Sequence, residues 1–200
     1  ELVTLIRREN RYKAKIIPAL SMLPSYTQLG MAALLPNQEL EIVNDETSTV
    51  QVDGNSSKGV KYREKILNNE VDKKGSCIQA SKWLEMDNVK KRELSKNCNV
   101  LYIYQNKIDQ TGDKRDSEGQ VFNAVNQTLE DIISIVKSAS RSYFSHIVVT
   151  SDHGFIYQNQ AIDESDFSSI IVEAKKTLFK NRRFVLGKGF KKTDSFKTFK

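Results

Sequence analysis

The chain has 200 residues, of which 38% are hydrophobic and 28% charged, a composition that fits one globular domain with a sizeable core. No apolar run approaches the roughly 20 residues that a membrane-spanning helix needs, which argues against an integral membrane protein. The two cysteines, Cys77 and Cys98, lack metal-binding spacing, so we expect free thiols and a reducing cytoplasm.

The net charge of +6 is concentrated near the C-terminus. From Glu173 to Lys200 there are ten Lys or Arg residues against Glu173 and Asp194, which leaves about −2 for the preceding residues. Such a region can bind nucleic acid phosphates or acidic partners, and DNA is a candidate through Arg182, Arg183 and the C-terminal lysines. A solvated basic tail over about 188–200 is an equally good interpretation.

Residues 1–13 have apolar positions at helical spacing, but no capping residue precedes them. We therefore expect the natural protein to begin upstream of Glu1. Residues 15–17 are typical of a short strand that Pro18 ends.

Residues 24–36 are typical of a helix that starts at Pro24 and ends at Pro36. Because helix N-termini attract anions, Ser21, Ser25 or Thr27 would lie where a phosphate could bind. The alternative is that Ser25 simply caps the helix.

The middle of the chain, about 40–97, resembles a surface insertion. Residues 40–43 and 49–52 flank a polar turn and predict a hairpin. Residues 59–69 and about 78–95 are interpreted as helices, and Trp83 as a packing residue.

Two short apolar runs predict buried strands, at 99–104 and at 146–151. Asp109 and Asp113 follow the first strand, and Asp152 and His153 follow the second. A helix predicted over about 117–139 connects them, with Ser117 as a possible cap and with one apolar stripe formed by Val121, Phe122, Val125, Leu129, Ile132, Ile133 and Val136.

This β-α-β arrangement should be right-handed with parallel strands, which would bring both acidic strand ends to one edge of the sheet. Asp and His side chains gathered there could bind a divalent metal. Taken one at a time, each motif could equally be an Asx-turn or a capped strand end. His146 starts its strand and should lie at the opposite edge. After Tyr157 we expect a polar loop, a short helix around 170–179 and a basic strand from 182 to 187.

Together, the segments Leu23–Pro36, Tyr102–Asp113 and Thr150–Phe155 resemble the PglZ domain, a member of the alkaline phosphatase superfamily from bacteriophage-exclusion (BREX) defence systems. The resemblance implies a single α/β domain over residues 1–200 with a mainly parallel sheet between helices. Its first strand would lie outside this chain, so the chain would be an N-terminally truncated fragment of a bacterial protein.

The resemblance also implies a cytoplasmic, metal-dependent phosphatase or phosphodiesterase. Asp109, Asp113, Asp152 and His153 would bind the metal, with zinc as first choice and manganese or magnesium as alternatives. Thr27 would be the nucleophile, with Ser25 as a close rival. Other phage-defence proteins would be partners.

Two departures from the family pattern favour an alternative. Gln105 stands where the family is expected to carry histidine, and no counterpart of the family's first metal-binding Asp occurs. The alternative is a catalytically degenerate scaffold that contacts DNA or partner defence proteins.

Overall fold

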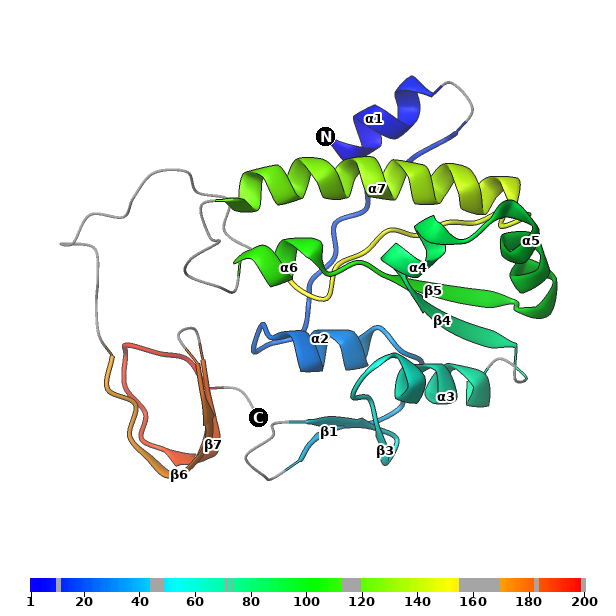
Figure 1. The fold of residues 1–200 in the computed structure, drawn as a ribbon. Helices are drawn as coiled ribbons and strands as arrows, with labels where there is room; N and C mark the ends of the chain where they lie inside the picture. Colours follow the sequence, from blue (N-terminus) through cyan, green and yellow to red (C-terminus); the bar gives the residue numbers. More distant parts are fainter. Residues whose placement is uncertain are drawn as a thin grey trace. The chain divides into compact units, whose positions relative to one another are not determined.

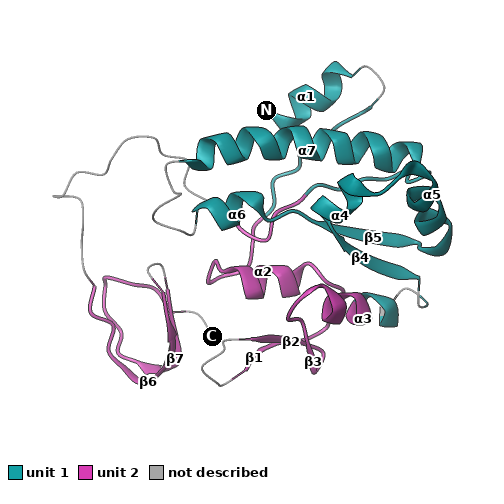
Figure 2. Ribbon diagram, viewed as in Figure 1, with its two compact units in different colours: residues 1–19, 67–149 teal, residues 20–66, 150–200 magenta. Residues whose placement is uncertain are grey.

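A computed structural model describes residues 1–9, 12–43, 49–70, 72, 74–112, 120–154, 170–181 and 184–198. The chain forms two compact units, each built from two separate stretches of sequence (Figures 1 and 2). The first unit contains residues 1–19 and 67–149, and the second contains residues 20–66 and 150–200.

The first unit is built on a pair of parallel strands, β4 (Gly75–Gln79) and β5 (Val100–Tyr104). Two helices, α4 (Ala80–Glu85) and α5 (Asn88–Asn97), connect these strands, as parallel pairing requires. The chain continues through α6 (Lys107–Gly112) to the long helix α7 (Val121–Arg141), against which α1 (Leu2–Arg8) and α4 also pack. These elements confirm an α/β protein.

Trp83 lies at the centre of the first unit's core. Its side chain is fully buried with Ala80, Ile135 and Ala139, and its indole N–H donates to Ser138 Oγ at 2.9 Å. The prediction that Trp83 is a packing residue is therefore confirmed.

The second unit contains an antiparallel sheet of β1 (Leu40–Ile42), β2 (Val50–Val52) and β3 (Asn55–Ser56). Helix α2 (Thr27–Ala33) packs on β1 and β2, and Val50 and Val52 are fully buried. Helix α3 (Val60–Glu70) leads into the first unit. The predicted hairpin at 40–43 and 49–52 and the helix at 59–69 are thus confirmed.

A second hairpin completes this unit. It pairs β6 (Ala174–Lys180) with β7 (Val185–Phe190) in antiparallel register, with an irregularity between Thr177 and Phe179. Of the strand predicted at 182–187, residues 185–187 lie in β7, whereas Arg182 and Arg183 fall outside the described residues. The helix predicted around 170–179 is wrong, because residues 170–173 have no regular structure and β6 begins at Ala174, where it pairs with β7.

The strand predicted at 146–151 is also wrong. Residues 144–150 have no regular secondary structure, and Val148 is 86% exposed. The β-branched residues favour an extended backbone, but a strand also needs a partner for its N–H and C=O groups. In the part of the chain that the structure describes, β5 pairs with β4 alone.

Two further expectations are wrong for similar reasons. Residues 15–17 form no strand, and Ile16 and Ile17 are about 80% exposed. Instead of the single helix expected over 78–95, residues 78 and 79 end β4, which pairs with β5, and two helices follow. The second helix begins where the Asp87 carboxylate accepts a hydrogen bond from the Lys90 backbone N–H. None of the described helices is long and apolar enough to cross a membrane.

Candidate active site

Helix α2 begins at Thr27 and holds the threonine hydroxyl against a histidine. The N-cap of α2 is Tyr26, which makes no side-chain capping bond, so the expectation that Ser25 caps this helix is wrong. Thr27 Oγ1 lies 3.1 Å from Nε2 of His153, although the two residues are 126 positions apart in sequence. Thr27 therefore has a specific polar partner instead of a capping role.

The second ring nitrogen of His153 fixes the direction of this hydrogen bond. Nδ1 lies 3.0 Å from the carbonyl oxygen of Gly154. A carbonyl only accepts hydrogen bonds, so Nδ1 carries a hydrogen. In the singly protonated ring Nε2 then keeps a lone pair, and the Thr27 hydroxyl donates to it.

Asp152 places a carboxylate beside the same nitrogen. Its Oδ2 lies 3.5 Å from His153 Nε2, and the two side chains are only 15% and 9% exposed. Among the described residues, this buried Oδ2 has no hydrogen-bond partner. A buried carboxylate oxygen that faces a nitrogen lone pair is costly unless a cation lies between them. The donor set of Asp152 and His153 therefore fits a divalent metal.

Close packing holds this segment against α2. A Cβ added to Gly30 would lie 2.8 Å from the carbonyl carbon of Asp152 and 2.9 Å from its Cβ, so only glycine allows this approach. The Ser151 hydroxyl donates to the carbonyl of His153 and stabilises the turn that carries both polar side chains.

Tyr26 precedes Thr27 and is buried against the β6–β7 hairpin. Its ring centroid lies 4.9 Å from that of Phe184. Burial raises the pKa of Tyr26 to about 12. The phenol is therefore protonated at neutral pH.

The other two predicted metal ligands belong to the first unit or fall outside the described residues. Asp109 is half-buried in the first turn of α6, in the first unit, whereas Asp152 and His153 belong to the second unit. Asp113, Arg182 and Arg183 lie outside the described residues. Within one unit, the structure thus brings together Thr27, Asp152 and His153. Searched over the described residues alone, the chain contains no group of three or more His, Cys, Asp and Glu side chains that could hold a metal.

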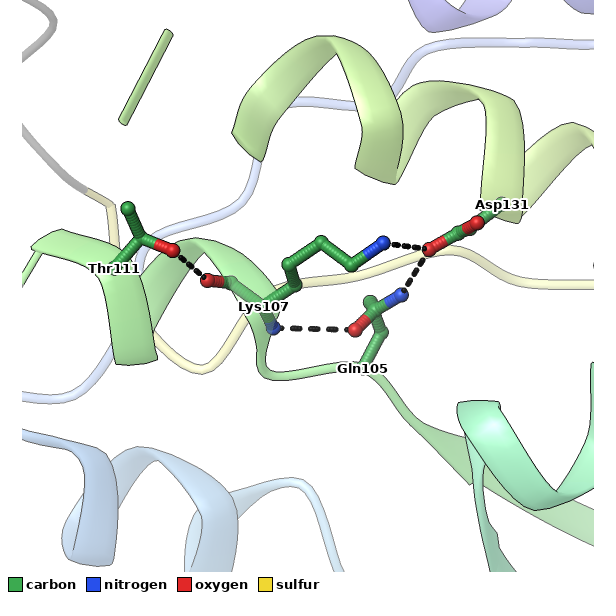
Figure 3. A network of polar contacts seen from close by, with 4 residues as sticks. All are labelled: Gln105, Lys107, Thr111 and Asp131. Atoms are coloured by element: carbon green, nitrogen blue, oxygen red, sulfur yellow. Dashed lines mark hydrogen bonds and ion pairs between the residues drawn. The ribbon is translucent and has the colours of Figure 1, made fainter. Parts of the chain in front are cut away.

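Gln105 belongs to a polar network that the sequence did not predict (Figure 3). Its side-chain N–H donates to Asp131 Oδ2 at 3.0 Å, and Lys107 forms an ion pair with the same oxygen at 2.7 Å. The Lys107 backbone N–H in turn donates to Gln105 Oε1 at 3.1 Å. Asp131 lies on α7, so the network ties the end of β5 and the start of α6 to that helix.

This network borders a cleft of about 710 Å³ in the first unit, at the carboxyl ends of β4 and β5. Its polar lining includes Gln79, Glu85 and Asn106 as well as the network residues. In the sequence, Asp131 is simply an acidic residue beside the apolar stripe of α7. This pattern does not indicate that Lys107, 24 positions earlier, is its partner.

Comparison with known proteins places these observations in a family. Residues 1–200 match the family described as the BREX system PglZ alkaline phosphatase-like domain. The chain is 37% identical over 188 residues, 94% of its length, to the alkaline phosphatase-like protein BrxZ of Escherichia coli O9:H4 (strain HS). It is 34% identical over 187 residues, 93% of its length, to the alkaline phosphatase-like protein PglZ of Bacillus cereus (strain H3081.97).

The chain spans 21% of the length of each of these two relatives. No solved structure matched the chain. The fold and the polar contacts described above are therefore read from this chain's own structure.

Proposed function

Because this chain belongs to the PglZ alkaline phosphatase-like domain family of BREX systems, we propose that it supplies a metal-dependent phosphoester hydrolase site to a phage-defence protein. The observation that carries the proposal is the Thr27 hydroxyl donating to His153 Nε2 beside the unsatisfied carboxylate oxygen of Asp152. A hydroxyl, an imidazole and a carboxylate in this arrangement suit phosphoryl transfer through an activated oxygen nucleophile.

Thr27 is the proposed nucleophile. Ser25 lies before α2, and the described contacts join His153 to Thr27, so the geometry favours threonine over serine. In the metal-free site the hydrogen bond holds the hydroxyl beside His153, and the absence of a side chain at Gly30 allows α2 to lie close to the Asp152 backbone.

Asp152 and His153 are the proposed metal ligands, and Asp109 and Asp113 the proposed remainder of the set. The lone pair on Nε2 can bind a metal or accept a proton, but not both at once. We assign it to the metal because the Nδ1–H bond to the Gly154 carbonyl fixes the ring as in metal-ligating histidines. When bound, zinc, or alternatively manganese or magnesium, would polarise the phosphoryl oxygen and lower the pKa of the hydroxyl.

The test is hydrolysis of aryl phosphate mono- and diesters by the intact protein with zinc, manganese or magnesium. Replacing Thr27 by Val, which keeps the shape but removes the hydroxyl, should lower kcat on the order of 10³-fold or more. Thr27→Ser should retain measurable turnover, and Ser25→Ala should behave as the matched control. Full activity in Thr27→Val would refute Thr27 as the nucleophile.

A second candidate function is a degenerate scaffold that binds partner defence proteins. The absence of a three-ligand cluster among the described residues favours it, as does the use of Gln105 in a structural network. Calorimetric titration of the intact protein with zinc separates the two candidates. Binding that disappears in Asp152→Asn supports the hydrolase, and the absence of any zinc binding supports the scaffold.

The whole protein's partners and location are proposals as well. BREX membership suggests other defence proteins as partners. We place the protein in the bacterial cytoplasm, where reduced Cys77 and Cys98 would persist as the free thiols found here.

A further inference from the structure

The β6–β7 hairpin and the residues that follow it carry a strong excess of positive charge. Residues 170–181 and 184–198 contain seven lysines but only two acidic residues, Glu173 and Asp194. Lys191 forms an ion pair with Glu173 at 3.0 Å. For the other six lysines, no ion pair is found within the described part of the chain.

Two of these lysines face each other across the hairpin. Lys176 on β6 is the direct register partner of Lys188 on β7, and both side chains are exposed. Like charges directly opposite one another destabilise an antiparallel pair. The hairpin therefore contains a repulsion that a bound polyanion would relieve.

A third lysine is held by the backbone of the opposite strand. Gly189 has a left-handed backbone, with φ of +66°, and a Cβ at this position would lie 2.7 Å from Lys175 Cγ. The aliphatic part of Lys175 thus lies over Gly189. Lys175 is exposed and precedes Lys176 in β6, so it lies on the opposite face of the hairpin from Lys176 and Lys188.

Aromatic rings attach this hairpin to the start of α2 within the second unit. Phe179 packs on Phe184 with centroids 5.8 Å apart, and Phe184 packs on Tyr26 at 4.9 Å. Tyr26 is the residue before Thr27. The hairpin is thus packed against Tyr26, the neighbour of the candidate nucleophile Thr27. A ligand bound along the hairpin would be held by this same element.

We propose that the β6–β7 hairpin is a nucleic-acid-binding ribbon, with Lys176 and Lys188 contacting backbone phosphates from the face that they share. A two-stranded ribbon fits the major groove of DNA, and a cross-strand pair of lysines suits the closely spaced charges of a phosphate backbone. The inference deepens the proposed function, because a nucleic acid both neutralises the ribbon and carries phosphoesters. The choice of nucleic acid over other polyanions as the hairpin's ligand rests on that proposed function.

Binding of the intact protein to labelled duplex DNA, measured by fluorescence anisotropy over a range of salt concentrations, tests the ribbon. We assume that each lysine neutralises one phosphate. The double variant Lys176→Gln with Lys188→Gln should then lower the slope of log K against log salt concentration by about 1.8 in magnitude. At roughly 0.15 M salt, this change corresponds to about 30-fold weaker binding. The double variant should fold normally, because it removes a repulsion. Lys82→Gln with Lys96→Gln is the matched control, since it removes two exposed charges from α4 and α5.

Hydrolysis separates this inference from the proposed function. The double variant should retain wild-type turnover of a small aryl phosphodiester but lose turnover of an oligonucleotide. If the wild type binds DNA but does not hydrolyse the aryl ester, the proposed function is wrong and the proposal that the hairpin binds nucleic acid stands.

If the double variant has unchanged affinity and an unchanged salt slope, the proposal that the hairpin binds nucleic acid is wrong. Lysine-dependent binding to polyglutamate or to phosphatidylserine vesicles, without DNA binding, would overturn the choice of nucleic acid.

Discussion

The buried Oδ2 of Asp152 makes the metal-free site electrostatically unfavourable. Replacing Asp152 by Asn removes the charge from this buried position. Without metal, we expect the free energy of unfolding to rise by about 1 kcal/mol. With zinc at about 100 times its Kd, the wild type should gain about 2.7 kcal/mol, and the variant should lose this gain. Thermal unfolding with and without zinc measures both effects.

Asp194→Asn is the control for this prediction, because Asp194 is an exposed aspartate on the same unit. It should leave the zinc-dependent stabilisation unchanged. If Asp152→Asn keeps the full zinc effect, Asp152 is not a metal ligand and the proposed site is wrong.

Gly30 determines how closely α2 approaches the Asp152 backbone. Gly30→Ala forces the helix or the Asp152 segment to move, because the new Cβ would overlap backbone atoms that have no rotamer freedom. We expect a loss of about 1–3 kcal/mol in the free energy of unfolding, together with weaker zinc binding. Urea denaturation and zinc titration provide the two measurements.

Gly154→Ala is the matched control. It adds the same methyl group one residue after His153, where nothing lies within 4 Å of the new Cβ. Equal losses in the two variants would show that the Gly30 contact has no special role.

At the scale of single residues, sequence reasoning identified part of the candidate site. Asp152 and His153 were predicted from two polar residues after an apolar run. Thr27 was one of three hydroxyl candidates near a helix start, and the family resemblance led to its choice. The physical link between them was not predictable, because it depends on the Gly30 contact and on the hydrogen bond to Gly154. The network around Asp131 was missed, since a single acidic residue on an amphipathic helix indicates no partner.

At the scale of elements, the Lys107–Asp131 ion pair should couple α6 to α7. Its side chains are 39% and 25% exposed, and a second hydrogen bond from Gln105 reaches the same carboxylate oxygen. A double-mutant cycle with Lys107→Met and Asp131→Asn should give a coupling near the upper end of surface pairs, about 1 kcal/mol. Chemical denaturation of the four proteins measures it.

The Lys90–Asp87 pair is the internal comparison. It is 3.4 Å long, with side chains 70% and 54% exposed, and should couple more weakly than the Lys107–Asp131 pair. A stronger coupling for this exposed pair than for Lys107–Asp131 would contradict the structural role of the network.

Elements with a strong local pattern were predicted well, and those that depend on pairing were not. Helix α7 is recognisable because its apolar stripe repeats at helical spacing over several turns. The apolar run at 147–149 has the composition of a strand but no partner among the described strands, and it is exposed. Conversely, β6 contains three lysines and one threonine among its seven residues, and its strand structure comes from pairing with β7.

At the scale of the whole molecule, the two units differ in how their cores are assembled. The core around Trp83 uses Ala80, Ile135 and Ala139, with partly buried partners between Ile78 and Phe144, so all of it lies in the continuous stretch 67–149. The second unit combines residues 20–66 with residues 150–200, and its α2–His153 and Tyr26–Phe184 contacts join the two stretches. The first unit can therefore form its core from one segment, whereas the second cannot.

This difference predicts the behaviour of fragments. A fragment of residues 67–149 should fold and keep Trp83, the chain's one tryptophan, buried, with blue-shifted fluorescence and protection from a soluble quencher. In that fragment, Ile135→Ala should cost about 2–5 kcal/mol, because it leaves a cavity beside Trp83. Val89→Ala, at a position 66% exposed, should cost little.

A fragment of residues 20–66 should remain unfolded by circular dichroism until residues 150–200 are added. Solvent-exposed Trp83 in the first fragment, or equal losses from the two substitutions, would mean that the first unit depends on the rest of the chain for its core.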